Sequence, residues 1–408
     1  MHVVDIDRLD RFVHDNGSTQ PRVVASGNHA VPWTALKTID RGFERYRLFM
    51  LNAPAGVPDR PGVTLETAFV GAGMRGRPSL AYYPSRLSLV PALLRHVLTP
   101  DIVVVHTSVP RDNTVSLGVE VNILRAAIES AHAHGGLVVA QLNRQMPFTY
   151  GDAVVSVEDI DVAIEVDVPL GELPTRSPGE VHRRIAANVA PLVPEGATLQ
   201  LGIGAVPDAT LGELRQRRGL RVWSEMISDG VLQLERAGAL SDDTIITSFA
   251  AGSAELYDWL DGNPRVRFLR TERTNDPAVI AQQPAMTSIN AALQVDLSAQ
   301  ANASYRGTQI YSGFGGQTDF VVGALHASDG HAIIALPSWH DASDSSTVVE
   351  RLCCPATSFQ HSAIVSEHGV ATIWGRSQQE QAQQLAENVA APAARDALRR
   401  AGTFASGR

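Results

Sequence analysis

The sequence predicts an α/β protein with two domains, each built on an open, mostly parallel sheet. Two observations predict the sheets. β-branched runs alternate with amphipathic helical segments in the first part of the chain, and the same alternation occurs again in the second part. A third observation predicts the division into two domains: residues 167–179 (DVPLGELPTRSPG) are rich in Pro and Gly, which is typical of linkers. We therefore expect an N-terminal domain over 1–172 and a C-terminal domain over 173–408.

The first domain contains a strand–helix–strand crossover. Residues 101–109 (DIVVVHTSV) and 137–142 (GLVVAQ) are apolar on both faces, as buried parallel strands are. The segment 117–134 between them has apolar residues at helical spacing and ends at Gly135-Gly136, a favourable helix terminus. The pattern predicts two neighbouring parallel strands joined by a helix.

The second domain repeats the alternation with shorter loops. Helical segments follow short apolar runs, and strands are expected at 197–201, 221–224, 244–249 and 266–269. In open sheets of this kind ligands bind at the carboxyl ends of the strands. The candidate loops considered below all follow expected strands, so they are expected on the ligand-binding edge.

Composition limits the class of partner. The 408 residues are 44% hydrophobic and 19% charged, with a formal net charge of -9. Nucleic-acid binding usually leaves a basic footprint, so we expect neither nucleic acid nor an anionic membrane as partner. No apolar run approaches the ~18 residues of a membrane span, and the start of the chain lacks a signal-peptide pattern, so a cytoplasmic location is expected. The two cysteines, Cys353 and Cys354, are neighbours and predict no disulfide framework.

Two patterns that mimic cofactor sites are set aside. Gly71–Gly76 matches G-x-G-x-x-G, but Pro78 and Pro84 interrupt the helix that a dinucleotide-binding motif requires. His132 and His134 are two residues apart and lie on different faces of a helix, unlike a metal-binding pair. We expect neither NAD nor a metal ion.

A glycine-containing loop follows the expected strand 197–201 and opens a helix. It consists of Gly202, Ile203, Gly204, Ala205 and Val206. Glycines let a backbone approach a ligand closely, and free N–H groups at a helix start favour phosphate or a developing oxyanion. On the pattern alone, a plain strand-to-helix turn explains the loop equally well.

Glu225 stands where the expected strand 221–224 ends. A carboxylate at that position faces the crevice above the sheet, which suits a nucleophile or a general base. An acid that stabilises the first turn of a helix is the simpler interpretation of the pattern by itself.

A second glycine-rich loop, 311–320 (YSGFGGQTDF), contains Gly313, Gly315 and Gly316. Such a run forms a tight loop whose N–H groups can face an oxyanion or the pantetheine of a cofactor, although a hairpin turn has the same composition. Upstream, 275–277 (NDP) is a turn. Asn290 is expected to point inward from a strand, where a hydrogen-bonded core amide is the simpler interpretation.

Taken together, these segments resemble the acetyl-CoA hydrolase/4-hydroxybutyrate CoA-transferase family. In the first domain YGDAVVSVEDID (150–161) is similar. The remaining matching stretches, in the family's order, are LQLGIGAVPDATL (199–211), SEMISDGV (224–231), NDPAVIAQ (275–282), SINAALQVDL (288–297), SGFGGQTDF (312–320) and AIIALPS (332–338).

The resemblance implies two CoA-transferase-type (NagB/RpiA-like) open-sheet domains with the active site between them. It implies that Glu225, in the second domain, forms a covalent glutamyl-CoA thioester. The loop from Gly202 through Val206 would contact CoA, and Gly315 and Gly316 would bind it beside the thioester and donate to the oxyanion. Asn290 and Gly313 are further candidates for oxyanion or substrate contacts.

The implied activity is transfer of CoA between a short-chain acyl-CoA and a carboxylate of the acetate or 4-hydroxybutyrate type. Coenzyme A would act as substrate and covalent intermediate without a metal, and the expected assembly is a homodimer or higher homo-oligomer. An acyl-CoA hydrolase using the same site, or an acyl-CoA-binding module without catalysis, are the alternatives.

Three segments depart from the family's pattern. The chain has SWHDASDSS at 338–346, where relatives typically carry lysines, and VAAPAAR at 389–395, where they have a His-Pro-Asp-Phe-like segment. Gln141 stands where relatives more often have glutamate. These departures leave the covalent chemistry intact and leave the acyl-group preference open.

Overall fold

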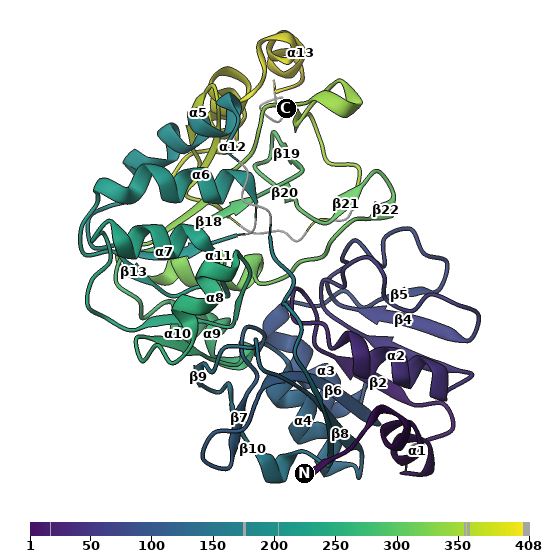
Figure 1. Cartoon of the computed structure of the whole chain (residues 1–408). Coiled ribbons are helices and arrows are strands. Elements are labelled where there is room, and N and C mark those ends of the chain that lie inside the picture. The colour runs from purple at the N-terminus through teal and green to yellow at the C-terminus, as the bar shows by residue number, and fades with distance from the viewer. Residues whose placement is uncertain (17, 174–176, 203, 355, 357–359, 403–408) are drawn as a thin grey trace. The chain divides into compact units, whose positions relative to one another are not determined.

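The structure is a computed structural model that describes residues 1–408 except 17, 174–176, 203, 355, 357–359 and 403–408 (Figure 1). The chain forms two compact units. Unit 1 comprises Met1–Thr175, Thr244–Thr274 and Tyr311–Gly315, and unit 2 comprises Arg176–Asp243, Asn275–Ile310 and Gly316–Arg408. The chain therefore crosses between the units several times. The predicted division at residue 172 lies close to the first crossing, and as a domain boundary it stays a prediction.

Unit 1 is built on an eight-stranded sheet in which all neighbours are parallel. The central strand β6 is buried along its whole length and β8 at all but its first residue, as expected for a parallel sheet covered by helices. In sheet order the strands are β1 (His2–Val3), β11 (Val162–Val166), β8 (Leu137–Asn143), β6 (Ile102–Ser108), β2 (Arg22–Ala25), β3 (Tyr46–Phe49), β4 (Val63–Thr67) and β5 (Leu80–Tyr82).

The predicted crossover in the first domain is confirmed. Strands β6 and β8 are parallel neighbours in register from Ile102↔Leu137 to Ser108↔Asn143, and helix α4 (Leu124–Ala133) lies between them in the chain. The helix begins seven residues later than the apolar spacing predicted, because residues 117–123, which follow strand β7 (Thr114–Ser116), form an irregular segment. Other helices of unit 1 are α1 (Ile6–Asn16), α2 (Trp33–Gly42) and α3 (Val90–His96).

Two strands expected in the sheet of the second domain belong to unit 1 instead. β15 (Ile245–Thr247) and β17 (Val266–Phe268) are parallel neighbours, and β17 also pairs with β9 (Tyr150–Gly151). Helices α8 (Ala254–Leu260) and α9 (Thr271–Thr274) complete this returning segment. The periodicity identified the strands but not their partners, because pairing between distant segments leaves no local signal.

Unit 2 is built on a six-stranded sheet with five parallel strands and one antiparallel edge strand. In sheet order these are β13 (Arg221–Val222), β12 (Thr198–Leu201), β18 (Met286–Ala291), β23 (His331–Ala335), β27 (Ala363–Ser366) and the edge strand β28 (Gly369–Thr372). Its helices are α5 (Glu180–Val189), α6 (Ala205–Glu213), α7 (Asp229–Arg236), α10 (Pro277–Ile280), α11 (Gln317–His326), α12 (Gln378–Gln384) and α13 (Pro392–Ala401).

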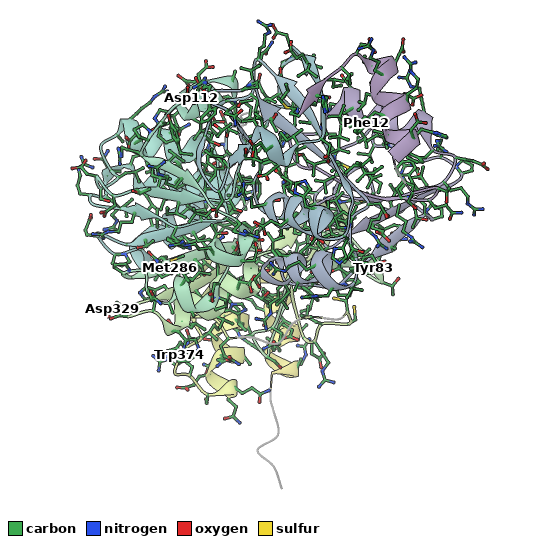
Figure 2. The ribbon with its side chains drawn as sticks, turned by 90° about the horizontal axis from the view of Figure 1, so that it is seen from below. Phe12, Tyr83, Asp112, Met286, Asp329 and Trp374 are labelled. Carbon is green, nitrogen blue, oxygen red and sulfur yellow. The ribbon has the colours of Figure 1, made fainter. Side chains whose placement is uncertain are left out.

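Alternation along the strands sends side chains of unit 2 to separate cores on the two faces of its sheet. Ile289 of β18 packs in a cluster with residues of α5 and α6. Met286, at the start of the same strand (Figure 2), packs instead with Phe320 of α11 and Ile280 of α10. Helices therefore cover both faces of the sheet, which leaves the carboxyl ends of its strands as the place for a ligand.

Gln141 has a clear structural role in unit 1. Its side-chain oxygen accepts hydrogen bonds from the backbone N–H groups of Thr34 (3.0 Å) and Ala35 (3.1 Å) at the start of α2. Its side-chain nitrogen lies 3.2 Å from Nε2 of His106, whose Nδ1 lies 3.2 Å from the carbonyl of Ala30. Burial lowers the pKa of His106 to about 4, so the ring is neutral at physiological pH. A neutral amide at 141 thus serves both the helix start and the imidazole.

A fully buried carboxylate, Glu120, lies among amides in unit 1. Asn28 Nδ2 donates to both of its oxygens (2.9 and 2.8 Å), and Asn122 Nδ2 donates to Oε1 (2.7 Å). Asn28 Oδ1 in turn accepts from Asn52 Nδ2 (2.8 Å). Burial raises the pKa of Glu120 from 4.5 to about 7, while the hydrogen bonds from Asn28, Asn122 and the Gly27 backbone oppose the rise.

This raised pKa predicts a pH-dependent contribution to stability. Between pH 4.5 and 7 the folded state keeps a proton that the unfolded state has released, so the contribution of Glu120 decreases as the pH rises. We expect the unfolding free energy of the wild type, relative to Glu120→Gln, to fall by about 2.5 kcal/mol from pH 5 to 8. His106 has the opposite dependence, but it is present in both proteins and cancels. Denaturant unfolding at several pH values measures the difference, and a pH-independent difference would contradict the prediction.

Candidate active site

Glu225 lies just beyond the carboxyl end of β13, at the ligand-binding edge of the unit 2 sheet. The preceding residue, Ser224, is fully buried, and its hydroxyl donates to the carbonyl of Met226 (2.7 Å), which closes the turn around the glutamate. The Glu225 side chain is itself half-buried. The local sequence therefore holds a carboxylate at a strand end with limited access to water.

Asn275 is the polar partner of that carboxylate. It is completely buried, and its Nδ2 donates a 2.7 Å hydrogen bond to Oε2 of Glu225. The sequence predicted only a turn at 275–277, and the structure shows that Asp276 caps α10 by accepting from the N–H of Ala278 (2.9 Å). Because Asp276 fills the capping role, the amide of Asn275 is available to Glu225. An Asn directly before a capping Asp is the sequence signal that could have identified it.

Gly316 lies against the same carboxylate. A Cβ atom placed on its backbone would overlap Oε2 of Glu225 and Nδ2 of Asn275, so no larger residue fits without moving them. Gly316 also occupies the N-cap position of α11. The structure thus brings together two predicted residues, Glu225 and Gly316, with one that sequence reasoning missed, Asn275.

The other glycines of the second loop lie in unit 1. A Cβ on Gly313 would lie 2.7 Å from the carbonyl oxygen of Ala68, which explains the need for glycine at that position. Gly315 has a φ of +55°, in the left-handed region that glycine adopts without strain, and its carbonyl accepts from the N–H of Leu87 (2.9 Å). These are structural reasons for both glycines, and their roles toward CoA stay predictions.

The first glycine loop has the predicted strand–loop–helix form. β12 ends at Leu201 and α6 begins at Ala205, so Ala205 and Val206 form the start of the helix, while Ile203 lies outside the described residues. The N–H of Gly202 donates to the carbonyl of Ile289 (3.0 Å), and Gly204 has a φ of 127° that favours glycine. The helix start presents backbone N–H groups at the carboxyl edge of the sheet, as an anion site requires.

Helices α6 and α7 meet close to Glu225. Ser228, the N-cap of α7, donates from its hydroxyl to Asp208 Oδ1 in the first turn of α6 (3.1 Å). A Cβ on Gly230 would overlap the side chain of Leu211, so glycine lets the two helices approach. Burial raises the pKa of Asp208.

Asn290 forms a reciprocal amide pair with Gln200. Its Nδ2 donates to Gln200 Oε1 (2.9 Å), and its Oδ1 accepts from Gln200 Nε2 (3.2 Å) across neighbouring strands. Both side chains are buried. Asn290 is therefore a hydrogen-bonded core amide, as the simpler interpretation of the sequence held. A contact of Asn290 with substrate stays a prediction.

The segment 338–346 forms a small hairpin. β24 (Trp339–His340) pairs with β25 (Ser345–Ser346), and Trp339 Nε1 donates to Asp344 Oδ1 (3.2 Å). Within the hairpin His340 also contacts Ser343, and the segment carries acidic rather than basic side chains.

A second carboxylate lies at the carboxyl edge of the same sheet. Glu367 follows β27, its side chain is 11% exposed, and it accepts hydrogen bonds from the N–H (2.9 Å) and hydroxyl (2.5 Å) of Ser338 beyond β23. His368 Nε2 lies 3.6 Å from Oε1. The sequence pattern alone does not distinguish this acid from a surface residue.

The remaining features of the described residues do not add to this site. A cavity of about 350 Å³ in unit 2 is lined by residues within 298–300, 360–361 and 373–381, including the 59% exposed Trp374 (Figure 2). None of the predicted site residues lines it. Among the described residues there is no cluster of three or more His, Cys, Asp or Glu side chains suited to a metal ion, and no helix there combines the length and apolar character of a membrane span.

Comparison with known proteins identifies similar sequences over most of the chain. Residues 252–402 match the acetyl-CoA hydrolase/transferase C-terminal domain. The chain is 34% identical to the succinyl-CoA:acetate/propanoyl-CoA:succinate CoA transferase of Fasciola hepatica, over 97% of this chain and 84% of that protein. It is 37% identical to the 4-hydroxybutyrate coenzyme A transferase of Clostridium kluyveri, over 78% and 76% respectively. The acetyl-CoA hydrolase of Kluyveromyces lactis is 29% identical over 52% of this chain and 40% of that protein.

Solved structures show the same fold. RipA from Yersinia pestis superposes with a TM-score of 0.89 at 29% identity, covering 98% of both chains. A 4-hydroxybutyrate CoA-transferase from Porphyromonas gingivalis superposes with a TM-score of 0.79 at 28% identity, covering 98% of this chain and 96% of that one. These likenesses confirm the predicted CoA-transferase-type α/β fold.

Proposed function

The chain belongs to the acetyl-CoA hydrolase/transferase family and is a CoA-transferase, and on that premise we propose that it transfers CoA through a glutamyl-CoA thioester on Glu225. Its substrates would be a short-chain acyl-CoA and a carboxylate of the acetate or 4-hydroxybutyrate type. The observation that carries the proposal is the half-buried Glu225 carboxylate, which accepts the Asn275 amide and lies against the bare backbone of Gly316.

The chemistry needs a carboxylate as nucleophile. A Glu225 oxygen attacks the thioester carbonyl, and the C–S bond breaks to give a mixed anhydride and CoA thiolate. The thiolate attacks the glutamyl carbonyl of the anhydride, which releases the first acid as its carboxylate and leaves CoA on the enzyme. A second carboxylate then attacks the glutamyl thioester, and the same two steps in reverse release a new acyl-CoA. The energy of the thioester is retained, whereas a serine ester would lose it.

The neighbouring groups fit the demands of these steps. Each attack places negative charge on a carbonyl oxygen, and a preorganised N–H donor for such an oxyanion contributes typically about 3 kcal/mol. We assign this role to the backbone of the Gly315-Gly316 pair. Asn275 would orient the carboxylate for attack, and the start of α6, from Gly202 to Val206, would contact CoA.

Intact-mass analysis after addition of acetyl-CoA without an acceptor acid tests the covalent step. We expect a mass increment of one CoA, located by peptide mapping on Glu225 and removed by borohydride. Steady turnover with no such adduct at position 225 would overturn the proposal.

Hydrolysis is the second candidate function, because the chain is similar to a fungal acetyl-CoA hydrolase over about half its length. Water in place of the second acid would give hydrolysis from the same glutamyl thioester, so the two activities differ in how well water is excluded. Acetyl-CoA consumption measured with and without an added carboxylate such as propionate separates them. A transferase requires the acceptor, and a rate independent of it indicates a hydrolase.

A further inference from the structure

The short helix α9 (Thr271–Thr274) occupies a particular place in the chain. It belongs to unit 1, and the residue that follows it directly is Asn275, the partner of Glu225. An isolated helix of four residues is unstable in water, so its position depends on the contacts it makes. Arg270 immediately precedes this helix, so the contacts of Arg270 bear on the position at which the chain enters Asn275.

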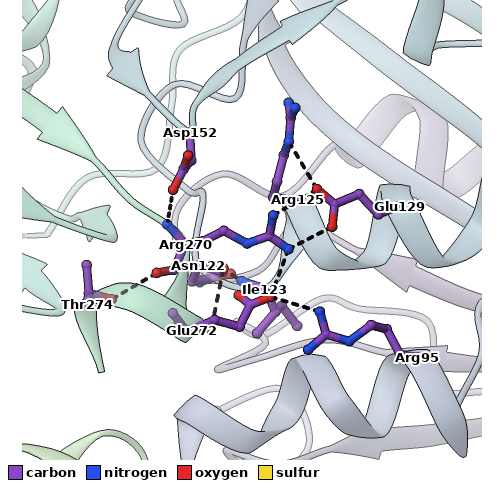
Figure 3. Close-up of polar contacts among 10 residues, drawn as sticks. Arg95, Asn122, Ile123, Arg125, Glu129, Asp152, Arg270, Glu272 and Thr274 are labelled. Carbon is purple, nitrogen blue, oxygen red and sulfur yellow. Dashed lines mark hydrogen bonds and ion pairs between the residues drawn. The ribbon is translucent and has the colours of Figure 1, made fainter. Parts of the chain in front are cut away.

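Arg270 is the centre of a polar network (Figure 3). Its two terminal nitrogens donate to the two oxygens of Glu129 in α4, both at 2.8 Å, which is a bidentate pair. Nη2 also donates to Oε1 of Glu272 within α9 (2.8 Å). The Arg270 side chain is only 23% exposed, so these pairs are less screened than ordinary surface ion pairs.

Two further arginines extend the network. Arg125 Nε lies 3.6 Å from Oε1 of Glu129, and Arg95 Nη1 of α3 lies 3.3 Å from Oε1 of Glu272. Hydrogen bonding to Arg270 holds the pKa of Glu129 below its ordinary value, so its charge persists at physiological pH. Helix α9 is thus tied to both α3 and α4.

The main chain of the same segment is anchored independently. The N–H of Arg270 donates to Asp152 Oδ2 (3.0 Å), and the N–H of Thr271 donates to the carbonyl of Asn122 (3.1 Å). Asn122 is held in turn by the buried carboxylate of Glu120. Main chain and side chains therefore fix one helical turn in unit 1, just where the chain leaves for Asn275.

We propose that Arg270 is a positioning residue for CoA transfer, which fixes the turn leading into Asn275 and thereby holds the Asn275 amide on the Glu225 carboxylate. The inference rests on the proposed function of Glu225. A nucleophile attacks efficiently only when its orientation is held within narrow limits, and the supporting residues of a site set that orientation. Arg270 needs no contact with substrate for this role.

The test is the single-turnover rate of glutamyl-CoA formation with saturating acetyl-CoA. We expect Arg270→Gln to lower this rate about tenfold, with KM for acetyl-CoA changed less than about twofold, because orientation rather than binding is lost. Arg270→Lys keeps the charge with a single contact and should lose less. The matched control is Arg111→Gln, which removes another arginine–carboxylate pair of unit 1 and should react like the wild type. In this pair Arg111 Nη2 donates to both oxygens of Asp261 (3.0 and 3.2 Å).

A double-mutant cycle separates positioning from general destabilisation. Asn275→Ala should lower the rate by roughly thirtyfold, and adding Arg270→Gln to it should cost less than about twofold more, because both act through one hydrogen bond. A full tenfold loss in the Asn275→Ala background, or equal losses in Arg270→Gln and Arg111→Gln, would overturn the inference. The CoA adduct at Glu225 of the wild type is measured in a separate experiment. The proposed function and the role of Arg270 can therefore be contradicted independently of each other.

Discussion

Glu225→Gln is expected to fold normally and to lose CoA transfer by at least about 10⁴-fold, since the amide cannot act as the nucleophile that forms the anhydride. The change is close to isosteric, and the amide oxygen can still accept the Asn275 hydrogen bond of 2.7 Å. The defect should therefore be chemical rather than structural. Steady-state kcat/KM with acetyl-CoA and an acceptor acid measures it, and the CoA mass increment should disappear.

The matched control for this variant is Glu213→Gln, which alters an exposed glutamate at the end of α6 in the same unit and should keep full activity. If Glu225→Gln retained several per cent of the wild-type rate, another carboxylate would be the nucleophile. Glu367, which lies at the same edge of the sheet, would then be the first group to examine.

Gly316→Ala is expected to lower kcat by about 100-fold or more, because displacements of about 1 Å at a reacting group have effects of that size. The added methyl group would occupy the space of Glu225 Oε2 and Asn275 Nδ2, so the carboxylate has to move or turn. Because the loss arises at the reacting group, it should appear in kcat and in the rate of glutamyl-CoA formation. Steady-state assays with an acceptor acid measure kcat, and quenched single-turnover experiments with saturating acetyl-CoA measure the rate of glutamyl-CoA formation.

Gly212→Ala provides the control for a glycine-to-alanine change. Gly212 lies within α6, and an added Cβ there meets no atom within 4 Å, so we expect normal activity and slightly higher stability. Wild-type kinetics in Gly316→Ala would contradict the prediction, because they would show that the Glu225 carboxylate does not react in its position against the Gly316 backbone. Thermal melting curves of both variants verify that the comparison is between folded proteins.

Much of the fold could be predicted from periodicity. The crossover between β6 and β8 was identified because buried parallel strands are continuously apolar, and β12 and β13 of unit 2 followed from short apolar runs before helices. The start of α4 was placed too early because apolar residues at helical spacing continue through the irregular segment 117–123 that precedes it. The strands at 244–249 and 266–269 were recognised as strands, but not as neighbours of β9.

The candidate site was predicted less completely. Glu225 and Gly316 were selected through the family resemblance, whereas pattern alone favoured a helix-start acid and a hairpin turn. Asn275 was missed because an Asn-Asp-Pro sequence has the composition of a turn, and only the folded chain shows that Asp276 alone serves as the cap. The structural role of Gln141 could not be predicted from the sequence either, because its hydrogen-bond partners at 34, 35 and 106 are distant in the sequence.

By itself the sequence predicted the α/β class, the alternation of strands and helices in several segments, and, through its motifs, the family and the candidate acid at position 225. These properties are local, because side-chain periodicity and short motifs record what each segment is. Only the tertiary structure decided which strands pair, that an amide 50 residues away holds the carboxylate, and that a backbone without a side chain lies against it. Those facts depend on atoms brought together by packing, and a hydrogen bond or a steric limit exists only once both partners are in place.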